Sequence, residues 1–285
     1  MENKTIFVTG GSGKVGGPVA LSLINKGFNV RVLARKPSSP TIQHLKSLGA
    51  EIIEGDLNHR ETFEDSLRNV DGLFCVLSYD YGVAKEIRQG FLITNLAKEH
   101  NIGHIIYSSA IGVDTNSGIP HWESKFKIEN HIKELGLPYT IIRPTSFYEN
   151  FLIPQVRSRI LKGTLSTPIG ANVVQQFNSA RDLGDICANI FLNPDPYLGK
   201  TITVAAEEMD MNKVTETFGE VMGRKMKYQQ LPMLLTRLFM GKGNAQMFKW
   251  VNTNDARFVK NLEAFKKEYP QMTSLKDWIK LNFNN

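Results

Sequence analysis

The sequence predicts a doubly wound α/β fold, a parallel sheet covered by helices on both faces, with a smaller α+β lobe in its C-terminal half. Apolar strand patterns alternate with amphipathic helical patterns through the first half of the chain. Two of these strands, Gly72–Leu77 and Tyr139–Ile142, are almost continuously apolar, as is typical of strands buried on both faces. Beyond about residue 145 the alternation gives way to irregular segments. We therefore expect a dinucleotide-binding domain at residues 1–150 and a substrate or partner lobe at residues 151–285, as one or two structural units.

Each expected element follows from its local pattern. Runs rich in β-branched and aromatic residues, bounded by turn residues, predict strands near residues 4–9, 28–34, 50–53, 71–77, 103–109 and 138–143. Apolar residues at helical spacing predict helices over residues 15–23 and 120–135. In the second half the same criteria predict strands at 173–177 and 201–204 and helices at 182–192 and 212–222.

The turn after the first strand carries three spaced glycines, in the sequence Thr-Gly-Gly-Ser-Gly-Lys-Val-Gly at residues 9–16. Such glycines allow a tight turn, a close approach of the backbone to a pyrophosphate, and packing of the next helix on the strand. The helix N-terminus then presents unpaired N–H groups to the phosphates. This pattern predicts a Rossmann-type dinucleotide site formed by Gly10, Gly11, Ser12, Gly13, Lys14, Val15 and Gly16. An ATPase-type phosphate loop is disfavoured, because Val8 and Val15 stand where it needs Gly and Ser or Thr.

The end of the second strand predicts which dinucleotide binds. Arg35 lies about 20 residues beyond the last motif glycine, where an acid would bind the ribose 2′-hydroxyl of NAD and an arginine the 2′-phosphate of NADP. No acidic residue occurs between Gly10 and Glu51. We therefore expect NADP(H) as the cofactor. The alternative is that Arg35 is a solvated surface cation.

Composition restricts the remaining classes of function. The chain has 285 residues, 41% of them apolar, no apolar run of 18 residues, and no targeting pattern at its start, so we expect a cytoplasmic protein without membrane association. The net charge of +6 favours anionic ligands, but the basic residues are dispersed, so we expect no nucleic-acid partner. Cys75 and Cys187 are expected to be buried, and the six histidines indicate no metal site. Nothing indicates an oligomeric state.

Ligands of doubly wound folds bind at the carboxyl ends of the strands. Besides the glycine loop and Arg35, those ends carry Asp56 and Leu57, Leu77 to Tyr79, Ser109, and Pro144 with Thr145. We expect them to converge on one crevice. Asp56 is placed either to bind the adenine amino group or to serve as a turn or helix-capping residue.

A candidate catalytic group lies on the helix expected from residue 120. His121 and Lys125 are four residues apart and share a helix face, and Ser109 ends the strand before it. This arrangement resembles the short-chain dehydrogenase/reductase superfamily, whose signature is Tyr-x-x-x-Lys preceded by an active-site serine. Asn95 matches the helix asparagine of that superfamily. The departure is His121, which stands in place of the tyrosine.

Several segments together resemble a narrower branch, the NmrA-like proteins. These are the glycine loop, residues 30–37, His-x-x-x-Lys, residues 143–150, residues 182–186 and residues 273–278. The resemblance implies NADP binding by the glycine loop, Arg35, Asp56, Leu57, Leu77, Ser78, Tyr79, Lys125, Phe147, Tyr148, Glu149 and Asn150. It also implies one of two functions, because some relatives reduce quinones, enones or similar molecules whereas others sense the nicotinamide cofactor and alter their association with regulatory proteins.

The residues allow several chemical roles. In a reductase, His121 can act as the acid while Ser109 hydrogen-bonds the substrate oxygen and Lys125 binds the nicotinamide ribose. Lys125, if desolvated, can instead transfer the proton. The third interpretation is that Lys125 only anchors ribose and His121 only solvates the helix start. We expect an NADPH-dependent reductase of small carbonyl, quinone or enone-type molecules, with a non-catalytic NADP(H) sensor of a partner protein as the alternative.

One apolar stretch carries no cofactor signal. Residues 231–250 are rich in Leu, Phe and Met and contain Gly241-Lys-Gly243. We expect this stretch to pack in the core, as apolar helical segments usually do. The alternative is a mobile flap over a substrate.

Overall fold

The computed structural model describes residues 4–283, which form two compact units. The first unit contains the chain up to Asn116 together with Pro120–Arg143 and Ala180–Ile202. The second contains Ser117–Ile119, Pro144–Ser179 and the chain from Thr203 onwards. Among the described residues, no helix is both long and apolar enough to span a membrane.

The first unit is built on the seven-stranded sheet, with strand order β10-β6-β5-β4-β1-β2-β3. Its strands are β1 (Thr5–Val8), β2 (Asn29–Ala34), β3 (Glu51–Glu54), β4 (Gly72–Val76), β5 (His104–Ser108), β6 (Tyr139–Pro144) and β10 (Lys200–Val204). The pairings from β3 through to β6 are all parallel. The order reverses between β1 and β4, and such a reversal is where doubly wound folds bind their ligands.

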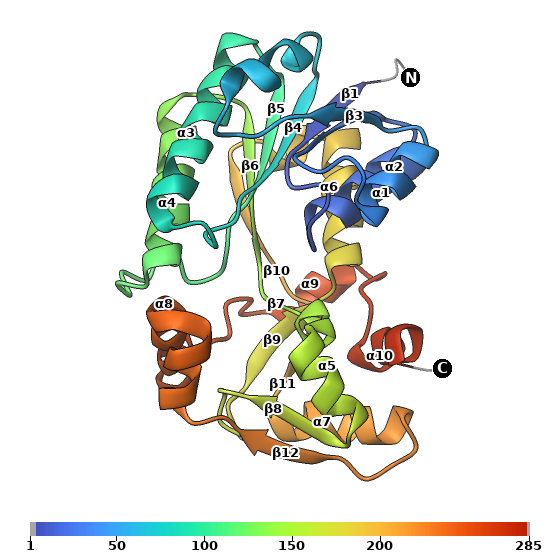
Figure 1. Cartoon of the computed structure of the whole chain (residues 1–285), viewed down its shortest axis with the longest axis vertical. Helices are drawn as coiled ribbons and strands as arrows, with labels where there is room; N and C mark the ends of the chain where they lie inside the picture. Colours follow the sequence, from blue (N-terminus) through green and yellow to red (C-terminus); the bar gives the residue numbers. More distant parts are fainter. Residues whose placement is uncertain (1–3, 284–285) are drawn as a thin grey trace. The chain divides into compact units, whose positions relative to one another are not determined.

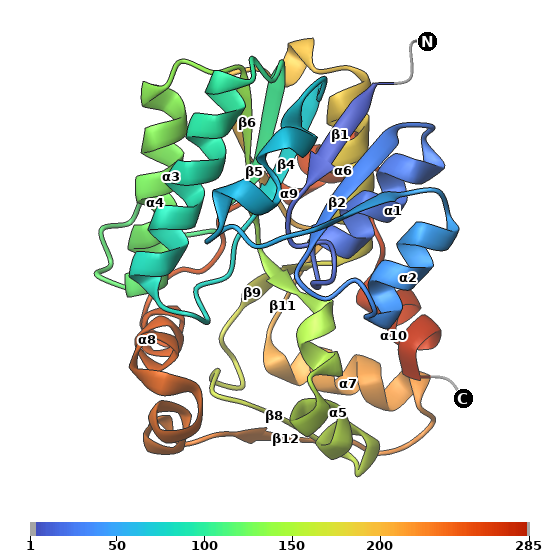
Figure 2. The ribbon, with the colours of Figure 1, turned by 45° about the horizontal axis from the view of Figure 1, so that its top comes forward.

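Helices cover both faces of this sheet (Figure 1). On one face lie α3 (Val83–Glu99) and α4 (Pro120–Glu134), side by side in Figures 1 and 2. On the other lie α1 (Gly16–Asn25), α2 (Pro40–Ser47) and α6 (Ala180–Leu192). The short helices η1 (Arg60–Thr62), η2 (Glu64–Leu67) and η4 (Asp195–Tyr197) lie in connections. The central strands are buried on both sides, as their apolar sequences predict.

A hydrophobic cluster joins the sheet to α3 and α4. Phe7 and Leu73 from the strands pack with Ile93 of α3 and with Ile128 and Ile132 of α4, all fully buried. The helices approach so closely that a Cβ added to Gly90 of α3 would lie 2.7 Å from the side chain of Ile128. This close contact fixes the position of α4, which carries His121 and Lys125, against α3.

The second unit combines small sheets with helices around an aromatic core. Its strands are β7 (Ser146–Phe147), β8 (Thr164–Thr167), β9 (Gln175–Asn178), β11 (Glu207–Met209) and β12 (Lys227–Gln230). Its helices are η3 (Tyr148–Leu152), α5 (Pro154–Leu161), α7 (Met211–Val221), α8 (Met233–Thr253), α9 (Leu262–Glu268) and α10 (Leu275–Phe283). Tyr148 stacks on Phe177 with 6.0 Å between ring centroids, and Phe151 meets Phe218 edge-on at 5.3 Å.

The predicted doubly wound sheet with a smaller α+β part is confirmed, and each of its first six strands lies within about two residues of the expected range. The division differs from the expected one at residue 150, because Ala180–Ile202 returns to the first unit. The short strands β7, β8, β11 and β12 were not predicted. Some of them, such as Lys227–Gln230, are mostly polar and have no apolar alternation.

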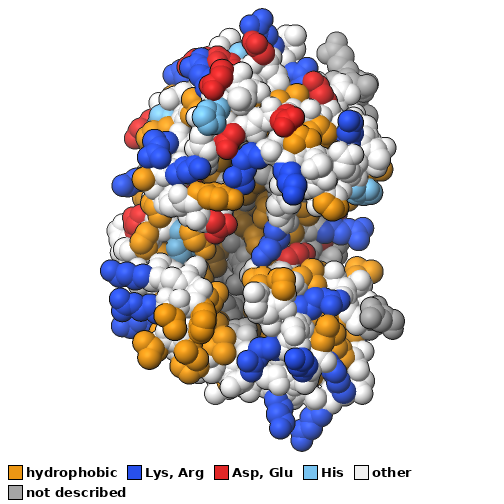
Figure 3. All heavy atoms as spheres, viewed as in Figure 1, with side chains coloured by type: hydrophobic (Ala, Val, Ile, Leu, Met, Phe, Trp, Pro, Cys, Tyr) orange, Lys and Arg blue, Asp and Glu red, His pale blue; other side chains and the backbone are white. Residues whose placement is uncertain are grey.

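The expectation that residues 231–250 pack in the core is wrong for the first part of α8. Leu234, Leu238 and Phe239 are 78%, 73% and 79% exposed. Figure 3 shows hydrophobic side chains gathered on the surface over α8. At Gly241 the backbone has φ +83°, which breaks α8 into two segments. The first buries Thr236, whereas the second buries the apolar residues Ala245 and Val251.

Candidate functional site

The glycine loop joins β1 to α1 in a tight turn. Gly10 has φ +65°, and the Gly13 N–H donates to the Gly10 carbonyl at 2.8 Å. A Cβ on Gly16 would lie 2.4 Å from the Gly10 oxygen, and one on Gly11 would lie 2.2 Å from Val32. The N-terminus of α1 has no side-chain cap and no acidic residue in its first turn. Backbone N–H groups therefore face an anion-binding position, as a pyrophosphate requires.

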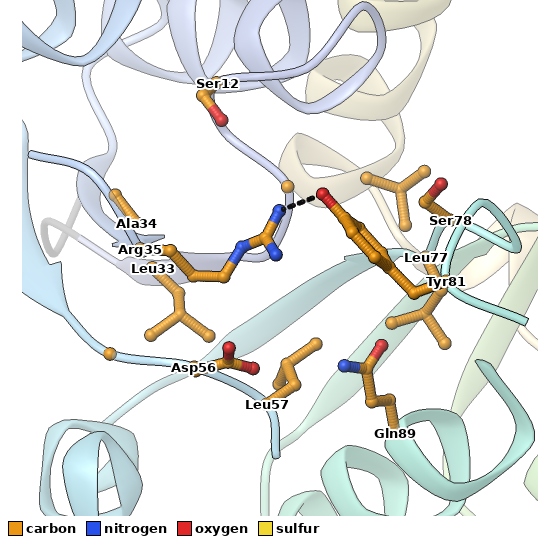
Figure 4. A pocket seen from close by; sticks show the side chains of 13 residues that line it. Ser12, Leu33, Ala34, Arg35, Asp56, Leu57, Leu77, Ser78, Tyr81 and Gln89 are labelled. Carbon is orange, nitrogen blue, oxygen red and sulfur yellow. Dashed lines mark hydrogen bonds between the residues drawn. The ribbon is translucent and has the colours of Figure 1, made fainter. Parts of the chain in front are cut away.

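A pocket opens beside this loop, in the first unit (Figure 4). It is lined by Gly10, Ser12, Leu33, Ala34, Arg35, Gly55, Asp56, Leu57, Val76, Leu77, Ser78, Tyr81 and Gln89. The lining comes from the carboxyl ends of β1, β2, β3 and β4, so part of the expected convergence is observed here. Tyr79, Ser109, Pro144 and Thr145, which were also expected in this crevice, are not among the lining residues. Leucines on several sides and polar groups at the rim suit a heterocyclic base linked to phosphates.

Arg35 extends into this pocket from the end of β2 (Figure 4). Its guanidinium lies 4.9 Å from the centre of the Tyr81 ring, and its Nη2 donates to the Tyr81 hydroxyl at 3.3 Å. Lys85 also lies over this ring, with Nζ 5.0 Å from the centroid. Within residues 4–283 Arg35 has no ion pair with a carboxylate, so its charge remains available to an anion.

Asp56 lines the pocket and also holds a turn. Its Oδ1 accepts from the Asn58 N–H at 2.9 Å and from the Asn58 side-chain amide at 2.5 Å. The turn role considered from the sequence is therefore present. Ser78 forms a similar local contact, because its Oγ donates to Asp80 at 2.6 Å.

Lys125 is buried against α3 and the end of β4. Its Nζ donates to Glu86 Oε1 at 2.9 Å and to the Leu77 carbonyl at 3.4 Å. Leu77 itself lines the pocket, so Lys125 contacts a residue of the pocket wall. Glu86 is fully buried, and its other carboxylate oxygen accepts from Ser124 Oγ.

His121 lies one helical turn before Lys125 and is 5% exposed. Its ring stacks on Tyr79 with 4.4 Å between centroids. Burial, with a smaller contribution from the positive charge of Lys125, lowers the pKa of His121 to about 4. His121 is therefore neutral at ordinary pH, and the imidazolium acid that the sequence suggested is not present.

Ser109 and Asn95 differ in how well they match the expected constellation. Ser109 directly follows β5, is buried, and its Oγ has no hydrogen-bond partner among the described residues. Asn95 lies on α3 but bonds His131 at 2.9 Å. It is nine residues beyond Glu86, about 13 Å along the helix. On α3 it is Glu86 that reaches Lys125.

The segment 147–150 lies in the second unit. Tyr148 is fully buried there, and its hydroxyl donates to Glu207 at 2.8 Å. Glu149 accepts from the Trp278 indole at 3.2 Å. Both side chains are thus used within that unit, whereas Phe147 is partly buried and Asn150 exposed.

Sequence reasoning missed Glu86, Tyr81 and Gln89. Glu86 had a signal, since it occupies the buried face of α3 together with Gly90, Ile93 and Ala97, where a charge is unexpected. Tyr81 and Gln89 had none, because only the fold brings them beside Arg35 and Asp56. Within residues 4–283 no cluster of His, Cys, Asp and Glu can hold a metal ion.

The chain is similar to known proteins in sequence and in fold. The profile of the NmrA-like family matches residues 2–279. An NmrA-like family domain-containing oxidoreductase of Malbranchea aurantiaca is 30% identical over 254 residues, which cover 80% of this chain and 76% of that protein.

Solved structures share the fold over almost the whole chain. Triphenylmethane reductase of Citrobacter sp., complexed with NADP(H), has a TM-score of 0.82 and 20% identity, and the match covers 97% of this chain and 99% of the reductase. NmrA, a negative transcriptional regulator in complex with NADP, has a TM-score of 0.80 and 18% identity, covering 99% and 96% of the two chains.

Proposed function

Since the chain belongs to the NmrA-like family, we propose that it binds NADP(H) and works as an NADPH-dependent reductase of small carbonyl, quinone or enone-type molecules. The observation that carries this proposal is one pocket that joins the glycine loop, the uncompensated Arg35 and the strand end contacted by Lys125. The oxidoreductase named among its relatives and the NADP(H) complex of triphenylmethane reductase support it.

The first unit supplies the groups that a phosphorylated dinucleotide needs. Gly11 and Gly16 of the loop have no room for a Cβ, and the loop would hold the pyrophosphate through backbone N–H groups. Arg35 would bind the 2′-phosphate through charge-assisted hydrogen bonds. Leu33, Leu57 and Leu77 would enclose the adenine.

The bound cofactor supplies hydride to an electrophilic carbon of the substrate. Lys125 would donate a hydrogen bond from its ammonium to a hydroxyl of the cofactor ribose. Ser109 donates its hydroxyl to the substrate oxygen, for which its unpartnered Oγ is suited. Neutral His121 contributes at most a ring N–H to that oxygen, so the proton comes from water or another donor.

A second function is favoured by one observation. The position of the superfamily tyrosine holds a histidine that stays neutral, which weakens the argument for a built-in proton donor. The NADP-bound neighbour NmrA is described as a transcriptional regulator. The alternative is therefore an NADP(H) sensor whose association with a regulatory protein depends on the redox state of the cofactor.

Two experiments separate these possibilities. Calorimetric titration should show NADP and NADPH binding more tightly than NAD and NADH, and equal affinities would contradict the role of Arg35. NADPH oxidation should then depend on substrate across a panel of quinones, enones and azo dyes, and should fall in Lys125→Ala. Tight cofactor binding without turnover on any substrate, together with a cofactor-dependent pull-down of a partner, would favour the sensor.

A further inference from the structure

The side chain of Glu86 is a buried carboxylate in a helix face that is otherwise apolar or small. It is 0% exposed and lies in the first turns of α3, opposite α4. Oε1 accepts from Lys125 Nζ at 2.9 Å, and Oε2 accepts from the hydroxyl of Ser124. The two carboxylate oxygens therefore bind two consecutive residues of α4, one residue each.

The ammonium of Lys125 is held from two elements. Glu86 contacts it from α3, and the Leu77 carbonyl contacts it from the end of β4. The other titratable groups facing it are His121 on its own helix, Tyr107 on β5 with its ring centre 6.0 Å away, and Cys75 on β4. In the described part of the chain, Glu86 is the only carboxylate that forms an ion pair with Lys125.

Such a pair is not explained by stability alone. Withdrawing two charges from water costs free energy that their attraction repays only with good geometry, and apolar residues of similar volume are often as stabilising. Here the pair lies beside the pocket wall at Leu77. An ammonium has three N–H donors, and two of them are used by Glu86 and Leu77. One donor remains, with its direction fixed by the other two.

We propose that Glu86 is a positioning residue that keeps the Lys125 ammonium charged and aims its remaining N–H at the cofactor ribose. This inference rests on the proposed NADP(H) site. It assigns Lys125 the role of a fixed hydrogen-bond donor rather than a group that transfers a proton. Glu86 belongs neither to the Tyr-x-x-x-Lys signature nor to the helix-asparagine position that Asn95 matches.

The test measures NADPH affinity by fluorescence titration at several pH values between 7 and 9. In Glu86→Gln the shape is retained and the counter-charge is lost, so the buried ammonium gives up its proton as the pH rises. We expect affinity to fall roughly tenfold between pH 7 and 9 in this variant, because a charge-assisted hydrogen bond is lost. The parent protein should vary less than about twofold over this range.

A double-mutant cycle distinguishes positioning from a merely structural role. If Glu86 acts through Lys125, Glu86→Gln should have no further effect on NADPH affinity in a Lys125→Met background. Glu129→Gln is the matched control, since Glu129 is also a fully buried carboxylate, but it pairs with Arg143. It should retain the pH profile of the parent.

The outcomes are distinct. Equal weakening by Glu86→Gln with and without Lys125, or a flat pH profile like that of Glu129→Gln, would overturn the role of Glu86. A parent protein that does not bind NADPH would instead refute the proposed function. If Glu86→Gln does not fold, Glu86→Asp keeps the charge but withdraws it from Lys125. It should weaken binding at every pH with a flat profile, and unchanged binding would overturn the inference.

Discussion

At the scale of single residues, Arg35 shows which pocket residues can be predicted from the sequence. Its place after the second strand was sufficient to predict a cation in the pocket, and the structure puts it there. The Tyr81 ring beneath its guanidinium was not predictable, because Tyr81 comes 46 positions later, in the turn after β4. Local pattern identifies residues fixed by the strand ends and misses those that arrive from distant loops.

Arg35→Glu should weaken NADP binding by about 2 kcal/mol, roughly thirtyfold, because a charge-assisted contact becomes a repulsion. NAD binding should change much less. Calorimetric titration with both cofactors measures the difference. Arg68→Glu makes the same charge change at a 72% exposed side chain outside the pocket and should leave both affinities unchanged. A similar loss in both variants would show that only net charge matters.

His121 links the site to acid stability. Its pKa is about 4 in the folded protein, against about 6.5 in an unfolded chain. Between these values the unfolded chain binds a proton that the native state excludes, so the stabilising contribution is complete above pH 6.5 and is lost as the pH falls towards 4. The slope approaches about 1.4 kcal/mol per pH unit. Burial also lowers the pKa of His104.

The check is urea unfolding of the parent and of His121→Gln at pH 7 and pH 5. The parent should lose more unfolding free energy than the variant over this interval. His59→Gln, at an exposed histidine whose side chain is 64% accessible, should behave like the parent. An equal loss in the parent and in His121→Gln would show that His121 does not titrate as described.

At the scale of elements, the contact between α3 and α4 determines where Lys125 lies. A Cβ on Gly90 would meet three atoms of Ile128, the nearest at 2.7 Å. The glycine therefore sets the helix separation at which Glu86 reaches Lys125. The sequence predicted α4 from its periodicity, but periodicity carries no information about how closely two helices approach.

Gly90→Ala should therefore lower both Tm and NADPH affinity, despite the higher helix propensity of alanine. Thermal unfolding and fluorescence titration provide the two readouts. Ile128→Ala removes the clashing atoms, so the double variant should regain affinity relative to Gly90→Ala. If Gly90→Ala alone left both NADPH affinity and Tm unchanged, the helices would tolerate a wider separation.

The first segment of α8 is the element that differs most from expectation. Its apolar residues suggested burial, yet Leu238 is 73% exposed whereas Val251, in the second segment, is 7% exposed. The break at Gly241 separates the two, because its positive φ changes the direction of the helix. Hydrophobicity alone does not reveal which side of such a break lies on the core.

Leu238→Asp should shift Tm little, since exposed substitutions usually change stability by less than about 0.5 kcal/mol. Val251→Asp should lower Tm strongly because it buries an unpaired charge. Scanning fluorimetry of the two variants makes the comparison. Equal destabilisation would mean that Leu238 is covered in solution.

At the scale of the whole molecule, the sequence predicted the sheet well because each strand carries its own apolar run. It did not predict the division into units, because the return of Ala180–Ile202 depends on long-range contacts. Ser22 of α1 donates to Asp185 of α6 at 2.7 Å, and a Cβ on Gly184 would meet the Pro18 carbonyl at 2.7 Å. The periodicity that predicts a helix does not show which other element the helix will pack against.

A chain cut at the expected boundary should therefore be incomplete. Residues 1–150 lack both α6 and β10, so α1 loses its packing partner and the sheet loses an edge strand. We expect this fragment to show no cooperative urea transition, whereas residues 1–204, which contain all of α6 and β10, should show one. Circular dichroism during urea titration measures both. A cooperative transition of residues 1–150 matching that of the longer fragment would contradict this view.

The packing of α6 on α1 also has a consequence for biosynthesis. On the ribosome, α1 is complete at residue 25, but residues 26–179 must be made before its partner begins. At about 5–20 residues per second this takes on the order of ten seconds. During that interval the face of α1 that α6 will cover is open to chaperones and to other nascent chains. This protein is therefore exposed at α1 from early in its translation until α6 has been made, well before synthesis ends.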